Sequence, residues 1–75
     1  MEPREAALRV LADDPGADLH WTVIWERALK AAYIDPFTQT GAREEVIAGL
    51  AAEAKGGSIE RTSKGTYRLA RASSG

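Results

Sequence analysis

The second half of the chain carries a small set of basic, amide and hydroxyl side chains whose types and spacing suit contacts with nucleic acid. They are Gln39, Thr40, Arg43, Lys55, Arg61 and Lys64. An Arg side chain can donate two hydrogen bonds to the edge of a guanine, whereas a phosphate contact needs only positive charge and reach. We therefore regard Arg43 as the candidate base contact and Arg61 and Lys64 as candidate backbone contacts. Lys55 adds a further cation, and Gln39 and Thr40 could donate to base edges or phosphate.

Several of these side chains also have an ordinary structural explanation. Arg43 could pair with an acidic residue three or four positions away on an exposed helix face. The Thr40 hydroxyl could cap a helix, and Lys64 could serve only to keep an exposed hairpin soluble. The formal net charge is −1, but Glu60 is the single acidic residue of residues 54–75, whereas acidic residues predominate in residues 1–35. The locally basic end favours contact with a polyanion.

Side chains that build catalytic or metal centres are sparse. His20 is the only histidine and there is no cysteine, so neither a metal-ligand set nor a Cys-His nucleophile pair is available. Asp13 and Asp14 adjoin in sequence, but they lie in a turn-rich segment rather than in a catalytic carboxylate arrangement. The pair Gly56 and Gly57 follows a helix-patterned stretch, whereas a phosphate-binding loop precedes a helix. We therefore expect no enzymatic activity, cofactor, metal ion or small-molecule substrate.

The spacing of apolar residues predicts that the candidate base contact lies on a helix over residues 42–54. Apolar residues recur there at intervals of three and four, which lines one face of an amphipathic helix. Thr40 is expected to be the N-cap, and Gly56 and Gly57 are expected to end the helix. The predicted apolar face consists of Ala42, Val46, Ile47, Leu50, Ala51 and Ala54.

Two alternating stretches, residues 58–62 and 66–70, predict a β-hairpin. We expect a three-residue loop over residues 63–65, with Gly65 in the left-handed conformation. The resulting pairs are Thr62 with Thr66, Arg61 with Tyr67, Glu60 with Arg68, and Ile59 with Leu69. This register puts two aliphatic side chains on the inner face and an opposite charge pair on the outer face. A two-residue loop would split the apolar residues between the faces.

The first half of the chain predicts two helices and one short strand. The first helix covers residues 3–12, with Pro3 in its first turn, and the second covers residues 23–32, with Thr22 as its N-cap. Residues 19–21 suffice only for an edge strand. The inner side of the second helix is expected to carry Ile24, Trp25, Ala28, Leu29 and Ala32. We also expect at least one of the two tryptophans to be buried, and Tyr33, Ile34 and Phe37 to fold back over the core.

The predicted order is helix, short strand, helix, helix and two-stranded hairpin, which is the order of an α+β winged helix. A helix-turn-helix would lie within its three-helix core, and the hairpin would form the wing. The length of 75 residues fits one small domain, which we assign to residues 1–71, with residues 72–75 as a flexible tail or the start of a linker. No apolar stretch approaches the ~20 residues of a membrane helix, and no secretory leader pattern occurs. We expect a cytoplasmic protein without a membrane partner.

Four stretches of the chain are similar to one known family. Residues 6–8, residues 19–24, the pair Val46 and Leu50, and residues 64–69 together resemble the HARE-HTH winged-helix domains, and the likeness extends over about residues 4–70. Members of that family occur fused to restriction enzymes, to chromatin regulators and to the delta subunit of bacterial RNA polymerase. The resemblance implies a DNA-related setting, in transcription regulation or in DNA modification and restriction, or a protein contact.

These features predict a non-enzymatic module that binds double-stranded DNA, with the third helix in the major groove and the wing on the backbone. Acidic residues outnumber Arg43 on that helix, so a monomer should bind weakly, and useful affinity would require a homodimer or attachment to another domain. The alternative is a module that docks on a protein of a transcription or restriction complex. Acidic residues of the first half support that alternative, namely Asp13, Asp14, Asp18 and Glu26.

Overall fold

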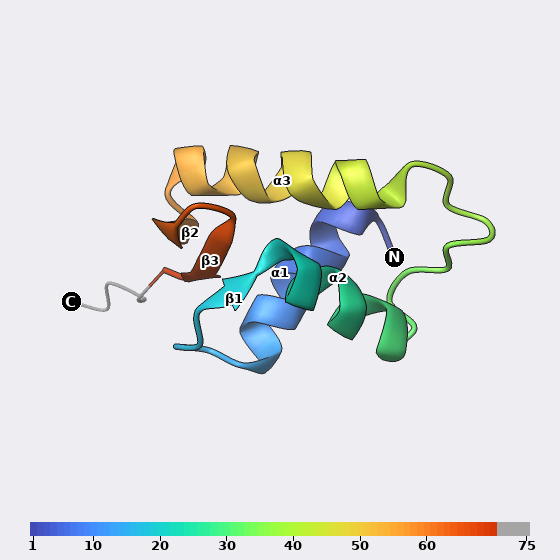
Figure 1. Ribbon diagram of the computed structural model, residues 1–75, viewed down its shortest axis with the longest axis horizontal. Coiled ribbons are helices and arrows are strands. Elements are labelled where there is room, and N and C mark those ends of the chain that lie inside the picture. The colour runs from blue at the N-terminus through green and yellow to red at the C-terminus, as the bar shows by residue number, and fades with distance from the viewer. Residues whose placement is uncertain (71–75) are drawn as a thin grey trace.

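The computed structural model describes residues 1–70, in which three helices surround one core and a small antiparallel sheet closes one side. The helices are α1 (Pro3–Asp13), α2 (Trp21–Lys30) and α3 (Ala42–Gly56), and the strands are β1 (Leu19–His20), β2 (Ile59–Ser63) and β3 (Thr66–Leu69). Figure 1 shows α3 along the long axis of the molecule, with the hairpin at its C-terminal end and the loop before α3 at the other end. The predicted α+β arrangement, winged-helix-like in topology, is confirmed. The proposed tail over residues 72–75 lies outside the described residues.

The core forms where α1 packs against α3. α1 begins at Pro3, as predicted, and continues one residue past the predicted end. Its buried residues recur at intervals of three and four, which makes one apolar face. The largest fully buried side chains of the molecule come from all three helices and from the sheet, and they are Leu11, Ile24, Val46, Leu50 and Ile59. Burying one such aliphatic side chain contributes about 1.5–3 kcal/mol.

α2 begins two residues before the predicted start, and the predicted N-cap Thr22 is wrong. The N-cap is His20, whose ring Nδ1 accepts a hydrogen bond from the Thr22 backbone N–H at 3.3 Å. The Trp21 backbone N–H donates to the Gly65 carbonyl in the hairpin at 2.8 Å. The backbone N–H groups of Trp21 and Thr22 have no partner within the helix and are thus satisfied by Gly65 and His20. The helix therefore begins nearer to β1 than predicted.

The predicted inner side of α2 is confirmed except at Ala32, because Trp25 and Leu29 also pack, partly buried, against the core. Ile24 and Ala28 are buried, whereas Trp21 and Trp25 are both only half-buried, so the expected burial of one tryptophan is wrong. The helix ends at Lys30, and Ala32 is exposed with a left-handed φ of 61°. The helix therefore stops before Ala32 can reach the core.

The loop between α2 and α3 covers the core with two residues, Ile34 and Tyr33, rather than three. Ile34 is only 2% exposed and Tyr33 is half-buried, but Phe37 is 94% exposed. The prediction that Phe37 folds back is wrong, because residues around it form a turn of their own. In that turn the Asp35 side chain accepts the Phe37 N–H at 3.0 Å, and the Asp35 carbonyl accepts the Gln39 N–H at 2.9 Å.

α3 starts and ends at glycines in the left-handed conformation. Gly41 is the N-cap with φ 76° and no side chain caps the helix, so the predicted cap Thr40 is wrong. At the other end Gly57 has φ 93° and its N–H reaches the carbonyls of the last turn, as predicted. A left-handed residue favours glycine because it has no Cβ to collide with the neighbouring carbonyl.

The buried face of α3 is turned relative to the predicted one. Ala42, Val46 and Leu50 are buried as expected, and Gly49 is buried beside them, whereas Ile47 and Ala51 are exposed. The reason is the close approach of α1. A Cβ added at Gly49 would lie 3.1 Å from the Cβ and Cγ of Arg4. Glycine at this position therefore lets this face of α3 pack closely against α1.

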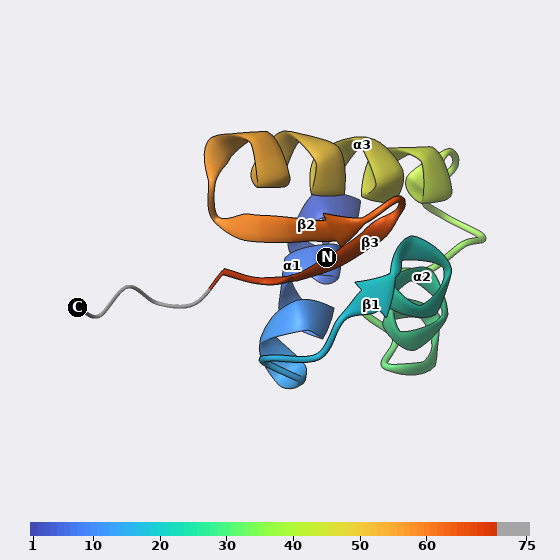
Figure 2. The same cartoon turned by 60° about the vertical axis from the view of Figure 1, so that its left-hand side comes forward.

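The sheet has the order β1-β3-β2, with both neighbours antiparallel to β3. Figure 2 shows the hairpin running beside α3, with β1 on its other side. The predicted pairs Ile59–Leu69, Glu60–Arg68 and Arg61–Tyr67 are confirmed. The predicted Thr62–Thr66 pair and the predicted three-residue loop are both wrong, because Ser63 lies opposite Thr66 and the loop consists of Lys64 and Gly65 alone. The register shifts between Arg61 and Ser63. Thr62 is therefore the extra residue of a β-bulge.

Within residues 1–70, no helix is both long enough and apolar enough to cross a membrane.

Candidate nucleic-acid interface

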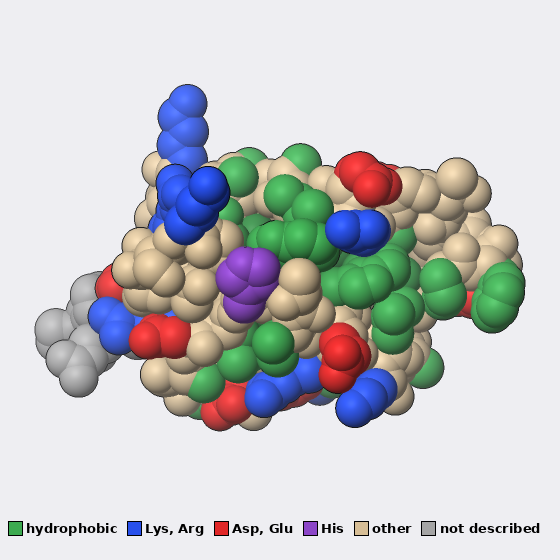
Figure 3. All heavy atoms as spheres, viewed as in Figure 1, with side chains coloured by type: hydrophobic (Ala, Val, Ile, Leu, Met, Phe, Trp, Pro, Cys, Tyr) green, Lys and Arg blue, Asp and Glu red, His purple; other side chains and the backbone are tan. Residues whose placement is uncertain are grey.

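One side of α3 presents residues that no other element covers. Arg43, Ile47, Ala51 and Lys55 follow one another at intervals of four, which aligns them along the helix, and all four are exposed. The stripe has a cation at each end and two apolar side chains between them. In the space-filling view of Figure 3, basic side chains gather over the hairpin and the adjoining end of α3, and hydrophobic side chains fill the surface between α3 and α2.

Arg43 at the start of α3 is held against an aromatic ring of α2. Its guanidinium carbon lies 5.0 Å from the centroid of the Trp21 ring, which is a cation–π distance. Within residues 1–70 no carboxylate forms an ion pair with Arg43. The contact fixes the direction of the arginine side chain while leaving its N–H donors free of acidic partners.

The tip of the hairpin is anchored to the same region. Gly65 has φ 71°, as the sequence predicted, and a Cβ there would lie 2.8 Å from the His20 Nε2 and 3.3 Å from the Trp21 Cδ1. The His20 and Trp21 rings are themselves neighbours, with centroids 5.7 Å apart. Trp21 thus contacts α3 on one side and the hairpin tip on the other, and its backbone N–H donates to the carbonyl of Gly65, the residue after Lys64.

The cations of the described chain fall into two sets. One set forms ion pairs with carboxylates, at N···O distances up to 4.0 Å, and comprises Arg4, Arg9, Arg27, Lys30 and Arg68. The other set has no such pair within residues 1–70 and comprises Arg43, Lys55, Arg61 and Lys64, which lie on α3 and the hairpin. The predicted pairing of Arg68 with Glu60 is present at 3.0 Å, and Asp18 lies 4.0 Å from the same guanidinium, so both carboxylates pair with Arg68.

Lys55 and Arg61 meet at a hollow between α3 and the sheet. Its lining residues are Ala51, Ala54, Lys55, Arg61 and Tyr67. Arg61 and Tyr67 are direct cross-strand partners on β2 and β3, whereas Lys55 reaches the hollow from the last turn of α3. The hollow therefore combines two cations, a phenol and apolar side chains.

The two residues before α3 differ in their surroundings. The Gln39 amide group accepts a hydrogen bond from the Asp35 N–H at 2.9 Å and donates one to the Met1 carbonyl at 2.8 Å. One N–H and one lone pair of that amide remain unused. Thr40 is exposed and takes no part in capping α3. Of the six predicted contact residues, Gln39 is the one most occupied by internal bonds.

Phe37 is a surface feature that sequence reasoning missed. Its side chain stands at the tip of the loop before α3, which the bonds to Asp35 and Gln39 hold in one conformation. An aromatic side chain flanked by proline and threonine gives no periodic signal, so the sequence offered no means of telling an inward from an outward ring.

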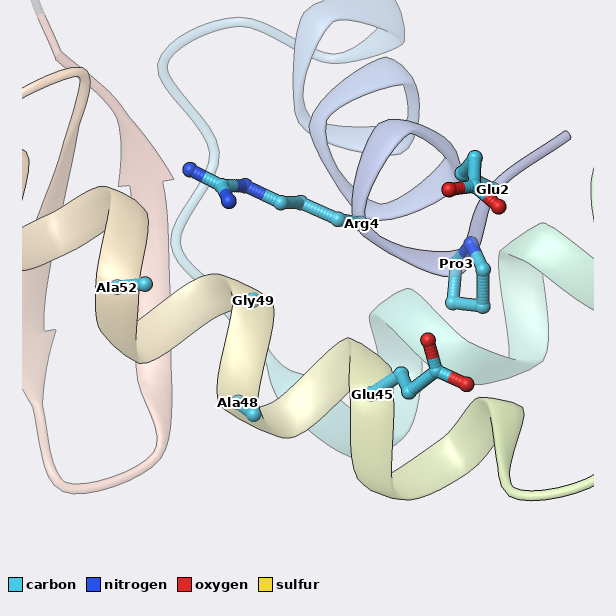
Figure 4. A pocket seen from close by; sticks show the side chains of 7 residues that line it. All are labelled: Glu2, Pro3, Arg4, Glu45, Ala48, Gly49 and Ala52. Carbon is cyan, nitrogen blue, oxygen red and sulfur yellow. The ribbon is translucent and has the colours of Figure 1, made fainter.

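A second hollow lies on the opposite side of α3, against the start of α1. It is lined by Glu2, Pro3, Arg4, Glu45, Ala48, Gly49 and Ala52. Figure 4 shows the Arg4 side chain running above Gly49 along α3, and the Glu45 carboxylate pointing toward the start of α1. Arg4 pairs with Glu53, which also accepts a hydrogen bond from the Ser58 hydroxyl. These two bonds, Ser58 foremost, hold the pKa of Glu53 below its ordinary value.

A cluster of hydrogen-bonded polar side chains joins α1 to the loop after α2. The Tyr33 hydroxyl donates to the Asp13 carboxylate at 2.6 Å, and the Arg9 Nε donates to the same carboxylate at 3.2 Å. The bond to Asp13 raises the pKa of Tyr33. The same bond is the main reason that the pKa of Asp13 is lowered. The cluster has ordinary internal partners and lies apart from the α3 stripe, so we assign it to stability.

Residues 1–70 contain no group of three His, Cys, Asp or Glu side chains arranged to hold a metal ion. Comparison with known protein families, with curated proteins and with solved structures found no match. The fold and the surface just described are therefore the basis for a function.

Proposed function

We propose that this chain is a non-enzymatic winged-helix module of HARE-HTH type that binds double-stranded DNA, in transcription regulation or DNA restriction in the cytoplasm. In this proposal α3 enters the major groove with Arg43, while Gln39 and Thr40 assist at its start. The hairpin holds the backbone through Arg61 and Lys64, with Lys55 beside them. The monomer binds weakly, and a second copy or a linked domain supplies useful affinity.

One observation supports this proposal above the others. Within residues 1–70, the cations without a carboxylate partner are the ones on α3 and the hairpin, whereas those on the remaining surface are paired. Phosphate contacts need cations whose charge is not already neutralised. Trp21 contacts the Arg43 guanidinium, and its backbone N–H binds the Gly65 carbonyl next to Lys64, so one residue connects the two cationic regions.

The size of the effect can be estimated from the number of cations. Each phosphate neutralised on duplex DNA contributes about −0.9 to the slope of log K against log salt. If Lys55, Arg61 and Lys64 each contact one phosphate, the slope is about −3. Such a slope is small beside that of strong binders, and it accords with weak binding by a monomer.

The direct test measures binding of the full chain to a fluorescent duplex of about 16 base pairs by anisotropy at several salt concentrations. We expect Lys64→Gln to weaken binding to every sequence and to reduce the slope by about 0.9. Lys30→Gln is the matched control, since it removes the same charge from the outer face of α2 and should leave binding unchanged. Arg43→Gln should instead reduce the preference among sequences. Equal loss from Lys64→Gln and Lys30→Gln would contradict the assigned face.

A second function, docking on a protein partner, is favoured by one specific observation, the exposed ring of Phe37. A Phe side chain that is 94% exposed on a hydrogen-bonded loop loses little conformational entropy when it enters a pocket of a partner. Aromatic side chains of this kind often dominate protein interfaces. Salt distinguishes the two functions, since binding through phosphate contacts falls steeply as salt rises and binding through Phe37 should largely persist.

A further inference from the structure

We propose that the hollow between α3 and the hairpin seats one sugar-phosphate unit of the duplex backbone, and that the Tyr67 hydroxyl is one of its donors. This inference rests on the proposed function. It adds the uncharged Tyr67 hydroxyl to the cations that are proposed above as contacts to the DNA backbone.

The first step is the convergence of three different donors on one hollow. Lys55 comes from the last turn of α3, Arg61 from β2 and Tyr67 from β3. An Arg fork can bind two oxygens of a phosphate, a Lys ammonium acts as a point charge, and a phenol donates one hydrogen bond. Among the five lining residues none is acidic, so no carboxylate competes with the phosphate there.

The second step concerns the Tyr67 hydroxyl. The residue as a whole is only 7% exposed, yet no group within residues 1–70 hydrogen-bonds to its hydroxyl. The structure nevertheless contains no buried side-chain oxygen or nitrogen without a partner in the described residues. The hydroxyl therefore reaches solvent, while the residue belongs to the core and is paired across the sheet with Leu19 and Arg61. A donor so fixed is pre-organised for a ligand.

The third step removes an electrostatic objection. The C-terminal end of a helix carries partial negative charge on its unpaired carbonyls, which disfavours an anion. Here the Ala54 carbonyl accepts from the Gly57 N–H and the Glu53 carbonyl accepts from the Ser58 N–H, each at 3.2 Å. The last carbonyls of α3 are thus partly satisfied. The positive charges of Lys55 and Arg61 outweigh the partial negative charge that remains.

The fourth step concerns the part of the ligand next to the phosphate. The apolar part of the lining comes from Ala51 and Ala54, whose side chains are methyl groups. Such a lining offers nothing to a free inorganic ion but suits the carbon atoms of a deoxyribose. The chemistry therefore favours a phosphodiester within a sugar backbone over inorganic phosphate.

The test uses Tyr67→Phe, which keeps the buried ring and removes only the hydroxyl. We expect duplex affinity to fall about tenfold or more, as for loss of one hydrogen bond to a charged group, with no change in the salt slope because no charge is removed. Lys55→Gln should weaken binding and also reduce the slope by about 0.9. Because Lys55 is exposed, its replacement keeps the test valid even if Tyr67→Phe disturbs folding. The control is Lys30→Gln, which should match the wild type.

A parallel titration follows backbone amide shifts with inorganic phosphate, against chloride at equal ionic strength. If the duplex binds but neither Tyr67→Phe nor Lys55→Gln weakens it, the hollow is not a backbone site, while DNA binding stands. If no duplex binds but phosphate shifts the amides of Lys55, Arg61 and Tyr67, the proposed function fails and the hollow remains a phosphate site. If neither ligand produces an effect, both proposals are overturned.

Discussion

The guanidinium of Arg43 lies 5.0 Å from the centroid of the Trp21 ring, joining the start of α3 to the start of α2. This pair connects the two helices at a point where no ion pair does so within residues 1–70. We expect it to contribute about 0.5–1 kcal/mol to stability, as cation–π contacts do at partly exposed sites. A double-mutant cycle of Trp21→Leu and Arg43→Gln in urea measures that coupling. A coupling energy near zero would mean that the two side chains are neighbours without mutual stabilisation.

The hairpin tip should tolerate a side chain poorly at Gly65. Gly65→Ala forces a left-handed residue, which costs roughly 1–2 kcal/mol, and brings a Cβ to 2.8 Å from the His20 Nε2. Gly41→Ala is a matched control, because Gly41 has a similar φ of 76° but open space around the Cβ position. Urea unfolding should show the larger loss for Gly65→Ala. Equal losses of stability in Gly65→Ala and Gly41→Ala would indicate that the tip moves away from His20 at no further cost in stability.

The Tyr33–Asp13 bond should make stability depend on pH at both extremes. Because the pKa of Tyr33 is raised in the fold, its contribution is complete below pH 10, the ordinary tyrosine value, and is lost as the pH rises above it. Because the pKa of Asp13 is lowered, its contribution is present above its ordinary value of 3.8 and is lost as the pH falls through the lowered pKa. Tyr33→Phe should flatten both limbs of a plot of urea midpoint against pH. A profile that keeps the wild-type shape would exclude this bond as their source.

The Glu53 carboxylate should contribute a separate acid transition. Its pKa is lowered by the Ser58 hydroxyl first and by Arg4 second, so its stabilising effect is present above the ordinary value of 4.5 and is lost as the pH falls through the lowered pKa. Glu53→Gln should be less stable than the wild type at pH 7, and the difference should shrink below pH 4.5. Ser58→Ala should remove the larger part of this dependence. A difference that stays constant from pH 7 to pH 3 would contradict it.

Two apolar side chains of the loop before α3 should respond in opposite ways to truncation. Ile34 is 2% exposed, so Ile34→Ala should cost about 2–5 kcal/mol of stability. Phe37 is 94% exposed, so Phe37→Ser should change stability by less than about 0.5 kcal/mol. If Phe37 serves a protein partner, the same variant should abolish that binding at moderate salt while leaving duplex affinity intact. Loss of stability in Phe37→Ser would show that the ring packs on the chain in solution.

Periodicity predicted the elements and most of the hairpin register, because these depend on local patterns. The pairs from Ile59–Leu69 to Arg61–Tyr67 followed from the need to place aliphatic side chains on one face. The bulge at Thr62 could not be predicted in the same way. It lies next to a tip that is bound by the Trp21 N–H and packed on His20, which are contacts between segments far apart in the sequence.

The candidate site was predictable in its charges but not in its surroundings. Arg43, Arg61 and Lys64 are conspicuous in the sequence as cations near a helix start and a hairpin tip. The role of Trp21 was hidden, because the ring packs against the core and also contacts Arg43 of α3, which is far from it in sequence. Exposure of Ile47 was hidden for a different reason. The apolar spacing of α3 is compatible with two different buried faces. Close packing of Gly49 against α1 selects the face that leaves Ile47 exposed, and glycine carries no hydropathy signal.

The central place of β3 in the sheet has a consequence for how the chain folds. β3 is the last strand in sequence, yet it pairs with β1 through Leu19 and Tyr67 as well as with β2. During synthesis the helices emerge first, but β1 has no partner and Ile59 has no opposite strand until residue 69 has left the ribosome. Loop closure over such a distance is slow compared with helix formation. We therefore expect the sheet, and with it the hairpin side of α3, to form only after residue 69 is available.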